Sequence, residues 1–192
     1  MLLTLRALGP DTLHAWLAFM DGPAFADNRD WGTCYCRAYL FAEPGPDAWD
    51  RACATPGLNR SHMIERIGAG TVDGLLAFRD GEAVGWTHYG ATSRFPTLLP
   101  ADDGVASIVC FVVAEKHRRS GVARGLLRGA CDDLSLRGFG AVDARPGTLS
   151  GGPAMEQFRG PLALYLSEGF SVAEEGAKWV RVRRPLTARP AR

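Results

Sequence analysis

A glycine-containing turn at residues 118–123 carries the clearest chemical signal in the sequence. It reads Arg118-Arg119-Ser120-Gly121-Val122-Ala123 and lies between an apolar run and an amphipathic helical pattern. At the start of a helix the backbone N–H groups lack partners and carry the positive end of the helix dipole, so they bind anions. Gly121 would let a phosphate approach the backbone closely. The turn therefore predicts a phosphate or pyrophosphate site.

Two other classes of phosphate-binding protein find little support in the sequence. The chain contains no Gly-x-x-x-x-Gly-Lys-Ser/Thr motif, and no Gly-x-Gly-x-x-Gly motif follows a predicted strand. The first motif is typical of P-loop nucleotidases and the second of dinucleotide-binding domains. Both classes are disfavoured.

The elements on either side of the turn would hold it in place. Residues 105–114 are almost continuously apolar, which predicts a central strand buried on both faces. The helix that follows runs to about Arg137 and ends at Gly138, a typical C-terminal glycine. Earlier in the chain, Asp80-Gly81 separates two strand-like runs and predicts a hairpin with a type I′ turn. One face of the helix is apolar, with Ala123, Leu126, Leu127, Ala130, Cys131 and Leu134.

The remaining pattern alternates between strands and helices. Strands are predicted at residues 2–5, 141–144, 171–173 and 178–184, and helices at 11–21, 46–54, 61–68 and 161–168. Basic residues gather after Arg181, where we expect a solvated end of the chain. The order predicts a mixed α/β protein with antiparallel hairpins on either side of an α/β centre. We expect one domain over residues 1–186 and a flexible basic tail over 187–192.

Composition limits the classes of function. The chain has 192 residues, 22 basic and 21 acidic side chains, and a net charge of +1. Such a balance gives no general attraction to a nucleic-acid backbone or an anionic membrane. No apolar run approaches the roughly 20 residues that a membrane helix needs. We expect a cytoplasmic protein with neither nucleic-acid nor membrane partners.

The cysteines do not point to a metal or a disulfide framework. Cys53, Cys110 and Cys131 occur singly inside apolar patterns, where a reduced thiol behaves as a small hydrophobic group. Cys34 and Cys36 form a Cys-x-Cys pair with no second Cys or His pair nearby, which is poor spacing for zinc. We expect no metal site.

The phosphate turn also resembles motif A of the GNAT N-acetyltransferases, Arg/Gln-x-x-Gly-x-Gly/Ala. A second stretch, Gly160-Pro-Leu-Ala-Leu-Tyr165-Leu-Ser-Glu-Gly169-Phe170, resembles the tyrosine-bearing motif B of that family. The Asp80-Gly81 hairpin matches the second and third strands of the family, so the resemblance covers roughly residues 2–186. It implies the GNAT fold, a mostly antiparallel sheet with a splayed parallel strand pair and helices on both faces.

The resemblance also implies an activity. A GNAT enzyme transfers the acetyl group of acetyl-CoA to an amine by direct attack in a ternary complex, and we expect a small-molecule acceptor. In the family, the pantetheine arm lies along the central strand, one of whose amides stabilises the oxyanion, and the pyrophosphate rests on the turn. The implied cofactor-binding residues are Phe111, Val112, Val113, Arg118, Arg119, Ser120, Gly121, Val122, Ala123 and Arg124.

Two residues are candidates for proton transfer. Tyr165 matches the motif B tyrosine that protonates the CoA sulfur in many family members, although it could instead only pack on its helix. His88, at the end of the predicted third strand, is the candidate base because imidazole titrates near neutral pH. Asp102, Asp103 and Glu115 are alternatives to His88, and each could equally be a solvated surface charge.

The acceptor site is predicted in the irregular segment before the second helix. Trp31, Cys34 and Tyr35 are its candidate substrate-binding residues, and a hydrophobic cluster that pins the loop is the alternative. The long glycine-rich link after Asp143 is either a lid or a surface loop. Two other functions stay open: a protein N-terminal or lysine acetyltransferase, and a non-catalytic acyl-CoA-binding module. Many GNAT proteins are dimers, so a homodimer is possible.

Overall fold

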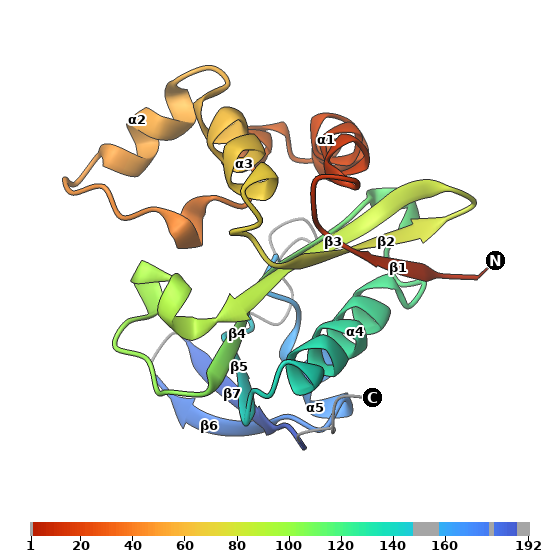
Figure 1. Ribbon diagram of the computed structural model, residues 1–192, viewed down its shortest axis with the longest axis vertical. Helices are drawn as coiled ribbons and strands as arrows, with labels where there is room; N and C mark the ends of the chain where they lie inside the picture. Colours follow the sequence, from red (N-terminus) through yellow and green to blue (C-terminus); the bar gives the residue numbers. More distant parts are fainter. Residues whose placement is uncertain (1, 148–157, 177–178, 188–192) are drawn as a thin grey trace.

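The computed structural model describes residues 2–147, 158–176 and 179–187. Its centre is a seven-stranded sheet with the order β1-β2-β3-β4-β5-β7-β6 (Figure 1). All neighbouring strands are antiparallel except β4 and β5, which are parallel. The strands are β1 (Thr4–Ala7), β2 (Gly74–Arg79), β3 (Glu82–Ala91), β4 (Val105–Val113), β5 (Ala141–Ala144), β6 (Ser171–Glu175) and β7 (Val180–Pro185).

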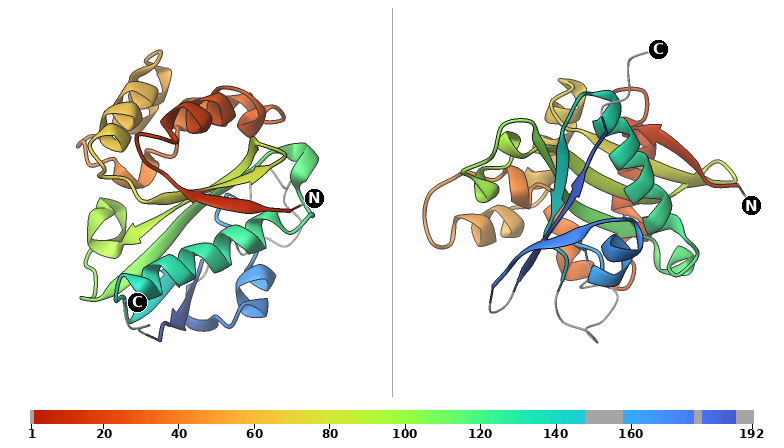
Figure 2. Two further views of the ribbon diagram at one scale, coloured as in Figure 1. Left: turned by 45° about the vertical axis from the view of Figure 1, so that its right-hand side comes forward. Right: turned by 90° about the horizontal axis from the view of Figure 1, so that it is seen from below.

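Helices cover both faces of the sheet, as the two views of Figure 2 show. Helices α1 and α3 pack on one face around Trp16, Met63 and Trp86, while α4 and α5 pack on the other around Leu127 and Tyr165. No helix within the described ranges is long and apolar enough to cross a bilayer. The helices are α1 (Leu13–Asp21), α2 (Ala48–Ala54), α3 (Leu58–Gly68), α4 (Val122–Leu136) and α5 (Leu162–Ser167).

The predicted turns are confirmed by the backbone. Asp80 and Gly81 connect β2 to β3 with φ angles of 50° and 85°, as a type I′ hairpin requires. Gly138, with φ 85°, follows the end of α4. Several boundaries differ from the prediction by two or three residues: β1 starts two residues later, α3 starts three residues earlier and β6 ends two residues later. Strand β7 also carries Arg183 within the sheet rather than on a solvated end. The predicted tail, 188–192, and most of the glycine-rich link, 148–157, lie outside the described residues.

Strand β4 separates from β5 halfway along its length. The two strands pair only from Val105 to Ile108, opposite residues 141–144. At the same level the register with β3 shifts, because Tyr89 faces Ile108 while His88 faces Cys110, which leaves Val109 as an extra residue in β4. Such a bulge bends a strand away from its neighbour. The second half of β4 therefore has an edge that β5 does not cover.

Candidate active site

A cleft of about 500 Å³ lies along the uncovered part of β4 and the start of α4. The structure brings nine of the ten predicted cofactor-binding residues to this cleft. Ser120 is the exception; its hydroxyl donates to the carbonyl oxygen of His117. The opposite wall comes from the segment at Ala24–Asn28 and from residues 158–164. Residues that are close in sequence thus form most of one wall.

The start of α4 presents backbone donors to the cleft. Gly121 is the N-terminal cap residue, with φ 85°, and the first helical hydrogen bond runs from the Gly125 N–H to its carbonyl oxygen at 2.9 Å. The N–H groups of Val122, Ala123 and Arg124 precede this ladder and have no partner within the helix. No side chain near Gly121 caps them among the residues described. This is the geometry of an anion site, as the sequence predicts.

Arg118 holds the turn to the rest of the protein. Both terminal nitrogens of its guanidinium bind the two carboxylate oxygens of Asp27, one of them at 2.9 Å. Its Nε donates to the carbonyl oxygen of Val113 at 3.0 Å. Hydrogen bonds from Arg118 lower the pKa of Asp27. The donors of Arg118 are therefore directed to protein groups, which makes it a positioning residue for the cleft.

Alternate amides of β4 face the uncovered edge. The Ala114 N–H donates to the carbonyl oxygen of Val84, so the Val112 amide also points to β3 by the alternation of an antiparallel ladder. The amides of Phe111 and Val113 consequently point to the cleft side. The Phe111 N–H donates to the carbonyl oxygen of Phe158 at 2.6 Å. Of the three predicted β4 residues, Phe111 and Val113 direct their amides to the cleft side, and the Phe111 amide is already bound to Phe158.

Tyr165 lies behind the cleft wall. Its side chain is 0% exposed, and its ring packs against Phe111 and Phe170 with centroid distances of 6.3 and 5.1 Å. Its hydroxyl donates to the carbonyl oxygen of Arg159 at 2.7 Å. Burial raises the pKa of Tyr165 well above its usual value, so the hydroxyl keeps its proton at neutral pH. The group can act as an acid only if the segment around Arg159 gives it access, and its role stays a prediction.

His88 lies on the other side of the sheet from α4. The side chain is buried between the rings of Trp86 and Phe95, and its Nδ1 is 3.2 Å from the carbonyl oxygen of Cys36. Burial lowers the pKa of His88 to about 4. It does not line the cleft, nor the second cavity described below, among the residues that the structure describes. Its role as a base stays a prediction without support from its position.

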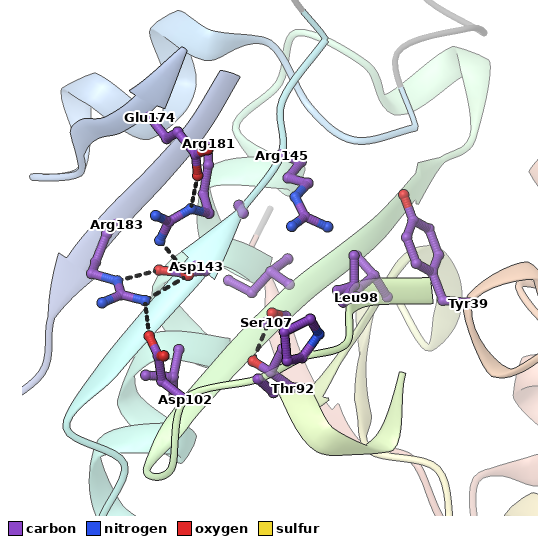
Figure 3. A pocket seen from close by; sticks show the side chains of 16 residues that line it. Tyr39, Thr92, Leu98, Asp102, Ser107, Asp143, Arg145, Glu174, Arg181 and Arg183 are labelled. Carbon is purple, nitrogen blue, oxygen red and sulfur yellow. Dashed lines mark hydrogen bonds and ion pairs between the residues drawn. The ribbon is translucent and has the colours of Figure 1, made fainter. Parts of the chain in front are cut away.

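A second cavity of about 210 Å³ opens along the first half of β4, between β4, β5 and β7 (Figure 3). Asp143 on β5 accepts hydrogen bonds from Arg181 and Arg183 at 2.7–3.0 Å. Arg183 also binds Asp102, and Arg181 binds Glu174. The cavity therefore has a dense ion-pair network along one wall, which the sequence reasoning missed.

The predicted acceptor residues are dispersed. Trp31 packs against Phe158 at the cleft, with a centroid distance of 5.2 Å, and the Tyr35 hydroxyl donates to Asp21 at 2.6 Å. Cys34 is half-buried, and burial raises its pKa to about 12. None of the three lines the second cavity among the described residues, whereas Tyr39 from the same segment does. The acceptor roles of Trp31, Cys34 and Tyr35 stay predictions.

Solved acetyltransferases share this fold. The PaiA N-acetyltransferase of Thermoplasma acidophilum, solved in complex with coenzyme A, aligns over 96% of this chain and 99% of its own with a TM-score of 0.59 and 12% identity. The GNAT domain of S. lividans PAT aligns over 96% of this chain and 90% of its own, with a TM-score of 0.58 and 19% identity. A ribosomal-protein-alanine N-acetyltransferase from Brucella melitensis aligns over 95% of this chain and 99% of its own, with a TM-score of 0.55 and 20% identity. These likenesses confirm the predicted fold.

The sequence itself identifies the family. Residues 37–148, more than half of the chain, match the acetyltransferase (GNAT) family, so the protein belongs to that family. The matched region contains β4, the phosphate turn and α4. No curated protein matches the sequence.

Proposed function

We propose that the protein transfers the acetyl group of acetyl-CoA to the amine of a small molecule. The observation that carries this proposal is the cleft on β4, which combines the free start of α4 with backbone amides on an uncovered strand edge. One end suits a pyrophosphate and the other suits the amide groups of a pantetheine arm. The family assignment supports the same reaction class.

The residues present fit coenzyme A by their chemistry. The N–H groups of residues 122–124 and the side chain of Arg119, which lines the cleft, would hold the pyrophosphate. The Val113 amide would pair with the arm, since the Phe111 amide is bound to the Phe158 carbonyl oxygen, and Phe25 and Leu164 supply apolar walls. When bound, the thioester supplies an activated acetyl group. A β4 amide directed at the developing oxyanion would contribute a few kcal/mol to the rate.

The acceptor would approach from the second cavity, along the first half of β4. A volume of about 210 Å³ accommodates a small amine. A protein acceptor would need a longer groove, and this is why we place the small-molecule reaction first. Tyr165 is the candidate acid for the departing thiolate because its hydroxyl is protonated.

The test uses two glycines that flank the same helix. Gly121 and Gly138 both have φ 85°, and a Cβ at either position meets no atom within 4 Å. Gly121→Asp places a negative charge at the proposed pyrophosphate site and should weaken acetyl-CoA binding at least about tenfold by like-charge repulsion. Gly138→Asp carries the same substitution at the far end of α4 and should leave binding unchanged.

Calorimetric titration with acetyl-CoA and thiol release with a panel of amines provide the measurement. Saturable binding, amine-dependent release of CoA and a selective loss in Gly121→Asp would support the proposal. Absence of acetyl-CoA binding in the unmodified protein would refute it. Transfer to peptide N-termini but to no small amine would replace the small-molecule acceptor with a protein.

A further inference from the structure

The second cavity differs in charge between its two sides. On the β7 side, Arg181 and Arg183 are joined to Asp102, Asp143 and Glu174 by ion pairs of 2.7–3.2 Å. On the opposite side, which we call the Tyr39 side, the Tyr39 hydroxyl and the Arg145 guanidinium point toward the cavity (Figure 3). The carboxylates of the lining thus lie beside two arginines, while Arg145 adds a third cation nearer to Tyr39.

Arg145 is the cation that lines the cavity on this side together with Tyr39. Burial raises the pKa of Tyr39, and the guanidinium groups of Arg159 and Arg145 act in the opposite direction. Arg159 itself stacks over the ring of Phe158 at 5.2 Å and is not among the described residues that line the cavity. One cation and a phenol therefore line one side of a small cavity. Planar guanidinium groups and a hydroxyl donor are suited to binding a carboxylate.

The register of the sheet fixes the place of Arg145 relative to the proposed reaction. Ala144 pairs with Ile108, so Arg145 follows at the level of the bulge residue Val109, which also lines the cavity. The Phe111 amide is two residues further along β4, roughly 7 Å away at the rise of a strand. Arg145 therefore follows the last pair of β4 and β5, at the point where the uncovered edge of β4 begins.

We infer that the Tyr39 side of the cavity binds the carboxylate of the acceptor, and that the acceptor is a small α-amino acid. This inference rests on the proposed function, and it names the substrate class of that site. In an α-amino acid the amine and the carboxylate are on the same carbon, so an acid held by Arg145 would present its amine next to the start of the uncovered β4 edge. Leu98 and Ile108 on the cavity wall provide apolar contacts for the side chain.

The experiment compares acceptors that differ only in the carboxylate. Leucine, leucinamide, 3-methylbutylamine and the aminophosphonate analogue of leucine, with the same set built on phenylalanine, would be assayed by thiol release with acetyl-CoA. We expect kcat/KM for the amino acid to exceed that for its amide and amine by at least about tenfold. The aminophosphonate analogue shows whether the site accepts any oxyanion or a planar carboxylate only.

Variants of Arg145 then test the assignment. Arg145→Gln should remove the preference for the acid through its KM, Arg145→Lys should restore part of it, and the exposed Arg51→Gln should have no effect. Melting temperatures of all variants would show that they are folded. Equal or better use of the amide or amine, an unchanged preference in Arg145→Gln, or acetyl-CoA binding without transfer to any amino acid would overturn the inference. Loss of acetyl-CoA binding itself would instead refute the proposed function.

Discussion

The two cavities along β4 are built in different ways. The cleft uses backbone groups from one continuous stretch, residues 111–124, and its anion site consists of amides at a helix start. The second cavity uses side chains from β4, β5, β6, β7 and the segment at Tyr39, joined by ion pairs. A backbone site depends on local fold and tolerates changes of side chain. A side-chain site depends on the identity of residues that only the tertiary structure brings together.

The comparison predicts that damage to one cavity should spare the other. The largest effect is expected at Asp143, which accepts hydrogen bonds from Arg181 and Arg183 and whose side chain is 12% exposed. Asp143→Ala leaves two arginines without their shared partner and should destabilise the protein by about 2–3 kcal/mol. The KM for the acceptor should rise, while the acetyl-CoA dissociation constant should stay within about twofold. Urea denaturation and calorimetry measure the two quantities.

Glu174→Ala is the matched control for Asp143→Ala. Glu174 binds Arg181 in the same network, but its side chain is 52% exposed, so its ion pair should contribute less than about 1 kcal/mol. A large loss of acetyl-CoA binding in Asp143→Ala would show that the two cavities are coupled through β5 and β4. The cleft would then not be independent of the side chains that form the second cavity.

A second prediction concerns His88, which belongs to neither cavity. Its folded pKa of about 4 lies below the ordinary value of 6.5, so the folded state disfavours the proton. The stability contribution is complete above pH 6.5 and is lost as the pH falls toward 4. The unfolding free energy should decrease by about 2 kcal/mol between pH 7 and pH 5 from this group. Urea denaturation of the wild type and of His88→Gln at both values measures the loss.

His14→Gln provides the control for His88, since His14 is exposed on α1. It should leave the pH dependence of stability unchanged, whereas His88→Gln should remove much of it. If His88→Gln instead abolishes acetyl transfer at neutral pH without altering stability, then His88 takes part in proton transfer from the reacting amine. That result would restore the base predicted from the sequence.

The sequence predicted the fold because its signals are local. Hydrophobic periodicity placed the helices and strands within a few residues, and Asp80-Gly81 specified the hairpin. The cleft was also predictable, because one motif contains both the helix start and the turn that leads into it. The roles of the individual residues in the cleft were less predictable. The motif that contains Arg118 does not reveal that its guanidinium binds Asp27, which is 91 residues away.

The second cavity could not be predicted in the same way. Tyr39, Asp143 and Arg145 become neighbours only after β5 pairs with β4 and the segment before α2 folds over the sheet. One signal was available. Arg181 and Arg183 alternate with the buried Val180 and Val182, which is the period of a strand with one polar face, and a buried polar face requires acidic partners.

A third prediction separates catalysis from packing at the cleft wall. Tyr165→Phe removes the hydrogen bond to the Arg159 carbonyl oxygen and should cost about 1 kcal/mol of stability. If the hydroxyl is also the acid, kcat should fall by about tenfold or more with little change in KM for acetyl-CoA. Tyr89→Phe is the control, because it removes a comparable hydrogen bond, 2.9 Å to Asp133, away from the cleft. Equal kcat values in the two variants would leave Tyr165 a packing residue.

The smallest effect is expected at Arg118, and it tests how far the cleft depends on backbone alone. Lysine keeps the charge but cannot bind both oxygens of Asp27 and the Val113 carbonyl together. Arg118→Lys should weaken acetyl-CoA binding only a few-fold, by loosening the turn. Arg60→Lys, which alters a similar two-pronged pair with both carboxylate oxygens of Asp21 away from the cleft, should not change binding. If Arg118→Lys instead matches the loss in Gly121→Asp, the guanidinium contacts the phosphates, and the cleft depends on side chains as much as the second cavity does.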